Sequence, residues 1–173
     1  MIGDTDFHKL RNGHDVAKER ASINGVDPGK TPMRSLSEQL LGSWTLVSHE
    51  SVRPDGSKIP VYGVSPEGIA MFDAGGHFII SAMRADRAGY AVDHPAQGTA
   101  EENKATSRGT MTYFGKYSVR EADRVIDIHI DASSFPNWNG VDQTRGFAIV
   151  GDELTLTVDA FGGHAEVKWK RAT

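Results

Sequence analysis

The sequence predicts an all-β protein, an eight-stranded, up-and-down antiparallel barrel with two short helices. From Trp44 onward the apolar residues recur with period two, which is the period of half-buried strands rather than of helices. The links between the expected strands alternate between tight turns and longer loops, so the tight turns gather at one end of the sheet. Eight such strands can close into a small barrel, which has no exposed edge strand and can hold one small ligand.

Eight segments alternate apolar and polar residues and are expected as strands. They cover residues 44–52, 67–73, 77–84, 111–119, 124–131, 144–150, 153–159 and 164–170. Tight turns are expected at Asp73-Ala74-Gly75-Gly76, Glu121-Ala122-Asp123 and Gly151-Asp152. The other links are longer, apart from the brief Phe161-Gly162-Gly163, so one end of the barrel is closed and the other is open.

Two capping boxes predict the helices. Ser35 and Glu38 can each satisfy a free backbone N–H at a helix start, and Gly42 suits the left-handed residue that stops the helix. Thr99 and Glu102 repeat the pattern in the longest link. They predict a short helix near residues 99–107 that would act as a lid over the open end.

Composition narrows the function. The chain has 173 residues, the length of one domain, with 19 basic and 23 acidic residues and no basic footprint for nucleic acid. It contains no cysteine, which excludes a disulfide scaffold, a thiol nucleophile and an iron–sulfur cluster. The polar start and the lack of a long apolar run predict a cytoplasmic protein with no membrane segment.

Residues 1–34 are predicted to be an N-terminal extension, separate from the barrel domain at 35–173. The extension is charged, is punctuated by glycine and lacks both apolar periods. Such a segment is usually a tail. The alternative is that it packs on the barrel or on a neighbouring subunit. Packing on a neighbouring subunit would make the protein a homo-oligomer.

Period-two phasing assigns the side chains that point into the barrel. At the closed end, four apolar residues are expected as a plug: Trp44, Val119, Ile149 and Trp169. At the open end, four polar residues share the inward phase: Glu50, Arg84, Tyr113 and Arg145. A charge in a partly apolar cavity is costly unless it is paired or binds something, so this cluster favours a ligand site. The alternative is a carboxylate–arginine pair that only closes the mouth.

His129 can be placed in two ways. The apolar rule turns the isoleucines of 124–131 inward and His129 outward. A bulge or a polar lumen would bring His129 inside, where Asp127 and Asp131 would raise its pKa and suit it to acid–base work. The same three residues resemble metal ligands, but no further histidine motif accompanies them, so no metal is expected.

The segment 133–140 combines an aromatic pair, Phe135 and Trp138, with the amide of Asn137. It is either a packed loop that covers the core or a rim that stacks on a flat ligand while Asn137 donates a hydrogen bond. With Tyr117 and Phe147, these three residues are the expected contacts to the body of a ligand.

The sequence resembles a known family in a series of motifs. Gly42-Ser43-Trp44 matches the Gly-x-Trp signature that opens lipocalin-type barrels. The series continues with Gly76-His77-Phe78, Met83-Arg84-Ala85-Asp86-Arg87, Tyr113-Phe114-Gly115-Lys116-Tyr117, His129, Phe135-Pro136-Asn137-Trp138-Asn139-Gly140 and Gln143-Thr144-Arg145. In this order and spacing it resembles the bacterial and fungal lipocalin-like domain family. The resemblance implies a calycin-type barrel with polar site positions at Arg84, Tyr113, Tyr117, His129, Asn137, Trp138 and Arg145.

Lipocalin-type barrels include both carriers and cofactor-free enzymes, so the fold leaves the activity open. The first hypothesis is an isomerase, cyclase or lyase that acts on a small carbonyl or aromatic compound without a cofactor. In it, Arg84 and Arg145 stabilise an oxyanion, Tyr113 or Tyr117 exchanges a proton, and Glu50 or His129 is the base. The second hypothesis is a carrier of a small hydrophobic anion. A third is an interaction module that uses the N-terminal arm.

Overall fold

The computed structural model describes residues 34–160 and 163–173. All residues of the predicted N-terminal extension except the last lie outside these ranges, and so does the alternative that the extension packs on the barrel or on a neighbouring subunit. Both therefore stay predictions. The first two residues of the short Phe161-Gly162-Gly163 link are also outside the described residues.

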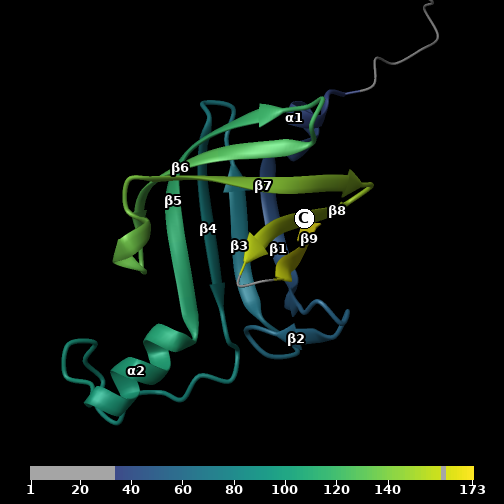
Figure 1. Ribbon diagram of the computed structural model, residues 1–173. Helices are drawn as coiled ribbons and strands as arrows, with labels where there is room; N and C mark the ends of the chain where they lie inside the picture. The colour runs from purple at the N-terminus through teal and green to yellow at the C-terminus, as the bar shows by residue number, and fades with distance from the viewer. Residues whose placement is uncertain (1–33, 161–162) are drawn as a thin grey trace, which may run out of the picture. The chain divides into compact units, whose positions relative to one another are not determined.

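Eight antiparallel strands close into a barrel, as predicted (Figure 1). Consecutive strands pair along the sheet, and the last strand returns to pair with the first. The barrel strands are β1 (Gly42–Val52), β3 (Glu67–Phe72), β4 (His77–Met83), β5 (Thr110–Arg120), β6 (Val125–Ser133), β7 (Val141–Val150), β8 (Glu153–Ala160) and β9 (Gly163–Arg171). Each overlaps one of the predicted segments.

An additional short strand, β2 (Lys58–Pro60), was not predicted. It pairs only with the end of β1, where Glu50 faces Pro60 and Val52 faces Lys58. All of its residues are exposed. A strand with no buried face has no apolar alternation, so the sequence carries no signal for it.

Both predicted helices are present, each with its capping box. In α1 (Leu36–Leu40), the Ser35 hydroxyl accepts from the Glu38 N–H at 3.1 Å, and the Glu38 carboxylate accepts from the Ser35 N–H at 2.8 Å. Thr99 and Glu102 make the same exchange in α2 (Ala100–Arg108). Gly42 follows α1 with φ of 112°, a conformation that favours glycine.

The closed end is filled by apolar side chains, as the phasing predicted. Trp44 is fully buried, and its indole N–H donates to the Leu40 carbonyl at 2.9 Å. The Arg171 guanidinium lies 4.0 Å from the centre of the Trp44 ring. Val119 and Ile149 pack against the same core. This plug ties α1 to the barrel.

A bulge in β1 changes which side chains face the interior. Leu46 is paired with Trp169 and Ser48 with Lys168, so Val47 is an extra residue, and its side chain is 49% exposed. Beyond the bulge, His49 is paired with the inward-facing Val167. Glu50 is turned to the outer face, so its predicted inward position is wrong. One inserted residue exchanges the two faces of every following residue in a strand.

A second bulge brings β5 and β6 unusually close at Gly115. The register shifts between Phe114 and Gly115, and a Cβ atom on Gly115 would overlap the His129 carbonyl oxygen. We expect Gly115→Ala to lower the free energy of unfolding by about 1–3 kcal/mol, because the strands must separate. Chemical denaturation measures this. Gly89→Ala is the control, since no atom lies within 4 Å of its added Cβ, and an equal loss in both variants would contradict the argument.

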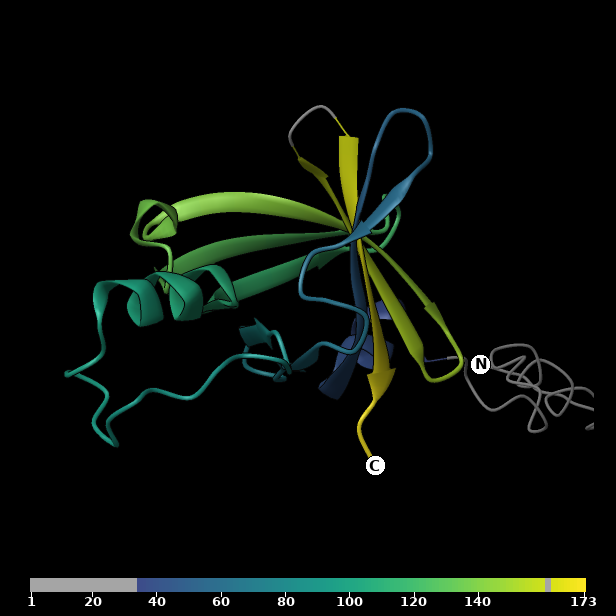
Figure 2. The ribbon, with the colours of Figure 1, turned by 90° about the horizontal axis from the view of Figure 1, so that it is seen from below.

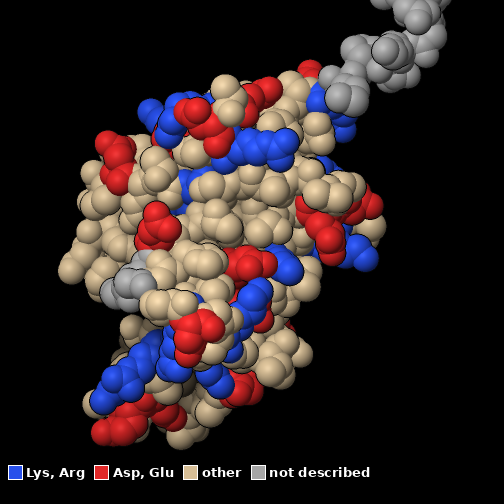
Figure 3. All heavy atoms as spheres, turned by 45° about the vertical axis from the view of Figure 1, so that its right-hand side comes forward, with Lys and Arg blue, Asp and Glu red and all other residues tan. Residues whose placement is uncertain are grey.

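Charges of both signs are mixed on the surface of the barrel. On the face shown in Figure 3, Lys and Arg side chains lie among Asp and Glu side chains and form no extended patch of one sign. Within residues 34–160 and 163–173, no helix is long and apolar enough to cross a membrane.

Candidate functional site

The barrel encloses a cavity of about 780 Å³, a size typical of small-molecule sites. Its walls come from the inward faces of β1, β4, β5, β7, β8 and β9. The apolar part of the lining includes Ile80, Ala82, Leu156, Val158, Val167 and Trp169. No residue of α2 lines the cavity. In Figures 1 and 2, α2 lies beside the end of β5, and the short 3-10 helix η1 (Pro136–Trp138) follows β6.

Arg145 provides a buried positive charge in this cavity. Its side chain points inward from β7, as predicted, and the residue is only 6% exposed. The guanidinium donates to the Thr144 carbonyl at 2.8 Å and to the Gln143 side-chain oxygen at 2.5 Å. In the part of the chain that the structure describes, no carboxylate lies within 4.0 Å of it. Both of these hydrogen-bond partners are neutral.

His49 lies in the same cavity and was not among the predicted site residues. The β1 bulge turns it inward, and its ring contacts the Tyr62 ring edge-on at 5.2 Å between centroids. Burial, with a smaller contribution from the positive charge of Arg145, lowers the pKa of His49 to about 4. The imidazole is therefore neutral at pH 7, when it can donate one hydrogen bond and accept another.

Aromatic rings form one wall of the cavity. Tyr113 is buried and packs edge-on against Trp138, with ring centroids 5.5 Å apart. Phe135 contacts Trp138 in the same way at 5.9 Å. All three line the cavity, as the sequence predicted for a site at the end of the barrel. Tyr62 also lines it, and burial raises the pKa of Tyr62, so its phenol stays protonated.

Two of the predicted inward charges lie elsewhere. Glu50 pairs with Lys58 on the outer face at 3.1 Å, and Lys58 also pairs with Glu166. Arg84 follows the last residue of β4, where the chain leaves the wall of the barrel, and its guanidinium makes two hydrogen bonds to Asp86. Neither residue lines the cavity, so the expected convergence of three charges is reduced to Arg145 alone.

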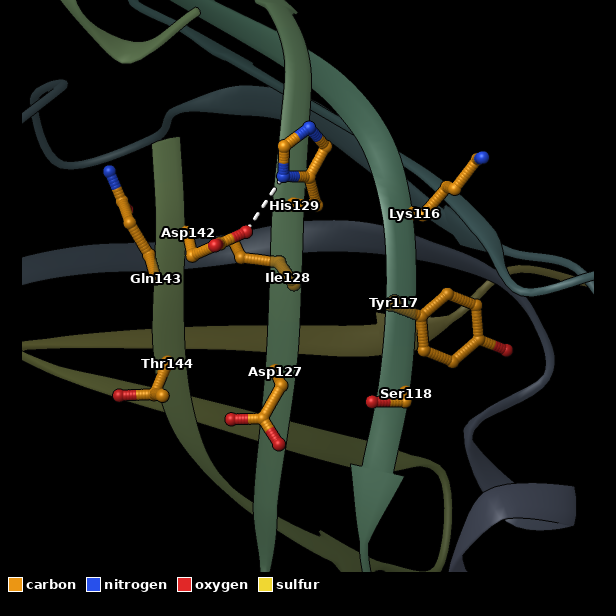
Figure 4. Close-up of a pocket in the computed structure, with 9 residues that line it drawn as sticks. All are labelled: Lys116, Tyr117, Ser118, Asp127, Ile128, His129, Asp142, Gln143 and Thr144. Carbon is orange, nitrogen blue, oxygen red and sulfur yellow. Dashed lines mark hydrogen bonds and ion pairs between the residues drawn. The ribbon is translucent and has the colours of Figure 1, made fainter. Parts of the chain in front are cut away.

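His129 lies on the outer face, because the isoleucines of β6 occupy the inward phase. Ile126, Ile128 and Ile130 are all buried. Figure 4 shows His129 beside Asp142 of the neighbouring strand β7, and the two side chains are hydrogen-bonded at 2.7 Å. They line an open depression on the outside of β5, β6 and β7, on the opposite side of the sheet from the cavity. The inward placement that a catalytic role required is therefore wrong.

The remaining predicted contact residues are also outside the cavity lining. Tyr117 donates from its hydroxyl to the Asp73 carbonyl at 2.8 Å and packs on Phe72. Phe147 is buried in the core. Asn137 is exposed, whereas the neighbouring Asn139 accepts a hydrogen bond from the Ser133 N–H and holds the loop. Counting by two along one strand shows which side chains point inward, but it does not show whether an inward side chain packs in the core or lines the cavity.

No metal site is visible among the described residues, since no three His, Asp or Glu side chains there are placed around one point. Besides the exposed carboxylate of Asp159, the cavity offers a guanidinium, a neutral imidazole and two phenols. These groups bind and orient anions, and they exchange protons.

An inward-facing cavity within a closed eight-stranded antiparallel barrel is the architecture that the Gly-Ser-Trp motif suggested. The sequence model of the lipocalin-like domain matches residues 41–172. The chain belongs to the lipocalin-like domain family. The resemblance drawn from the motifs is thus confirmed. No curated protein matches the chain. A lipocalin-like barrel with such a cavity is suited to binding a small molecule.

Two residues that line the cavity of the lipocalin-like domain, His49 and Tyr62, were not predicted from the sequence. His49 was missed because counting by two from Trp44 assigns it to the outer face, and the bulge at Val47 reverses that assignment. Tyr62 was missed because it lies outside the predicted strands, in the loop after β2. Leu46 is buried and Val47 is exposed, which is ordinary strand alternation, so only the pairing with β9 reveals the bulge.

Proposed function

We propose that the protein binds a small amphipathic anion in the barrel, with Arg145 holding the charged head. The observation that supports this is the buried guanidinium with only neutral partners. A buried charge without a counter-ion costs several kcal/mol, and an anionic ligand would remove that cost. A carboxylate, enolate or phenolate can accept two hydrogen bonds from one guanidinium.

The rest of the cavity defines the body of the ligand. The aliphatic wall offers no hydrogen bonds, and Tyr113 and Trp138 offer ring faces and edges. A planar or aromatic body gains stacking energy there in addition to burial of its apolar surface. The proposed ligand class is therefore an aromatic or short apolar acid.

Binding of two matched fluorophores tests this proposal. Anilinonaphthalene sulfonate carries one negative charge, and N-phenylnaphthylamine has a similar aromatic body without the charge. We expect the sulfonate to bind saturably and at least about tenfold more tightly, because of a charge-assisted hydrogen bond to Arg145. Trp138 and Trp169 line the cavity, so their emission reports occupancy. Equal affinity for the two compounds, or no saturable binding of either, would refute the proposal.

A second candidate function is cofactor-free proton transfer, as in an isomerase, cyclase or lyase. It is favoured by the neutral imidazole of His49 in the same cavity as Arg145. His49 would remove a proton next to a carbonyl, and Arg145 would stabilise the resulting enolate oxygen. The role first given to Glu50 or His129 would then belong to His49.

Deuterium exchange provides a test that needs no knowledge of the product. Phenylpyruvate, a small aromatic carbonyl acid, is incubated with the protein in D₂O, and exchange of its acidic C–H is followed by NMR. If the protein catalyses proton transfer, exchange with the wild type should be faster than in buffer. With His49→Gln it should be about 100-fold slower than with the wild type. His77→Gln is the control, since that imidazole is exposed and pairs with Asp73. If the wild type exchanges the C–H only at the buffer rate, the proton-transfer candidate is wrong and only the binding proposal remains.

A further inference from the structure

We infer that an anion binds in the cavity together with one proton, which His49 takes up as the ligand arrives. This inference rests on the proposed anion site at Arg145 and adds a second, titratable partner to it. The ligand would then lie between two cations, the arginine and an imidazolium. Binding would be linked to pH even for an anion that does not itself titrate.

The surroundings of His49 differ from those of the paired surface histidines. His129 has Asp142 at 2.7 Å, and His77 has Asp73 at 3.4 Å. Among the described residues, none of the ion pairs involves His49, and its closest aromatic neighbour is Tyr62. A histidine with a carboxylate beside it has its counter-ion already, whereas an anionic ligand in the cavity would supply one to His49.

The titratable and charged groups that line the cavity together with His49 come from several elements. Arg145 projects from β7, Tyr62 from the loop after β2, and Tyr113 from β5. Asp159 of β8 also lines the cavity, but it is exposed. The inward residues of β9 are Ala165, Val167 and Trp169, which do not titrate. For the protein alone, burial and the Arg145 charge hold the pKa of His49 near 4.

A bound anion would reverse the second of these effects. Its negative charge would offset the repulsion from Arg145 and attract a proton to the imidazole, so the pKa of His49 would rise in the complex. Because the complex then holds more protons than its free components, affinity increases as the pH falls. The increase is at most tenfold per pH unit. It stops at about pH 4, where His49 is protonated in the free protein as well.

Calorimetric titration of the full chain with anilinonaphthalene sulfonate tests the inference. The sulfonate stays ionised throughout, so any proton taken up on binding goes to the protein. Titrations at a pH near 5.5 in two buffers of different ionisation enthalpy give the number of protons. We expect at least about 0.2 of a proton per bound sulfonate. N-phenylnaphthylamine should produce none, and equal uptake with this neutral compound would overturn the inference.

Variants identify the group that takes up the proton. His49→Gln is expected to bind the sulfonate with no proton uptake, whereas His77→Gln should behave like the wild type. Unchanged uptake with His49→Gln would overturn the assignment. If that variant does not fold, an NMR titration of the His49 ring in the wild type replaces it. The pKa should rise by at least about one unit with the sulfonate bound, and a pKa that stays near 4 would overturn the inference.

The two proposals fail in different ways. If the wild type does not bind the sulfonate at all, the anion site itself is wrong. If it binds the sulfonate more tightly than the neutral compound but takes up no proton, the anion site stands and only the role of His49 is wrong.

Discussion

Replacing Arg145 with methionine is expected to lower the affinity for anilinonaphthalene sulfonate by about 10- to 100-fold. A hydrogen bond to a charged group contributes about 1.5–3 kcal/mol, and 1.4 kcal/mol corresponds to a factor of ten. Methionine keeps the apolar stem and removes the charge. The affinity for uncharged N-phenylnaphthylamine should change by less than about twofold, since its contacts are apolar. Fluorescence titration of both compounds measures the two effects.

Stability separates this result from simple misfolding. Arg145 is buried with no carboxylate beside it in the described residues, so Arg145→Met should leave the melting temperature unchanged or raise it. The control is Arg120→Met, which removes an exposed guanidinium paired with Asp123 and Asp127. This variant should bind the sulfonate like the wild type. Equal loss with both fluorophores for Arg145→Met would mean that cavity shape, rather than charge, was altered.

Trp44→Ala is expected to lower the free energy of unfolding by about 3–5 kcal/mol, the usual loss for a large aromatic side chain in a core. Trp44 is fully buried, donates a hydrogen bond to Leu40 and lies under the Arg171 guanidinium. The substitution removes the plug and leaves the Leu40 carbonyl without its donor. Urea denaturation measures the loss.

The matched control for this prediction is Val150→Ala. Val150 is an apolar residue at the end of β7 that is 75% exposed, so its truncation should change stability by no more than about 0.5 kcal/mol. A loss below about 1 kcal/mol for Trp44→Ala would show that the closed end does not hold the barrel together. Trp44 does not line the cavity, so the folded variant should still bind the sulfonate.

The regular strands could be predicted because their signal is local. In β7, Arg145 and Phe147 alternate with exposed or half-buried neighbours without interruption, so counting by two placed both side chains inside. In β6 the same rule placed the isoleucines inside and His129 outside. The capping boxes of α1 and α2 were also readable, because each depends on residues three positions apart.

Length and composition, the alternation of the strands and the two helix caps therefore determined the barrel, its closed end and the inward charge of Arg145. Only the tertiary structure decided that His49, rather than Glu50, accompanies that charge. The β1 bulge depends on pairing with β9, which lies at the other end of the chain, and no local property of Val47 announces it. The choice of Lys58 and Asp86 as partners for Glu50 and Arg84 was likewise decided in space, because an ion pair requires proximity that periodicity does not describe.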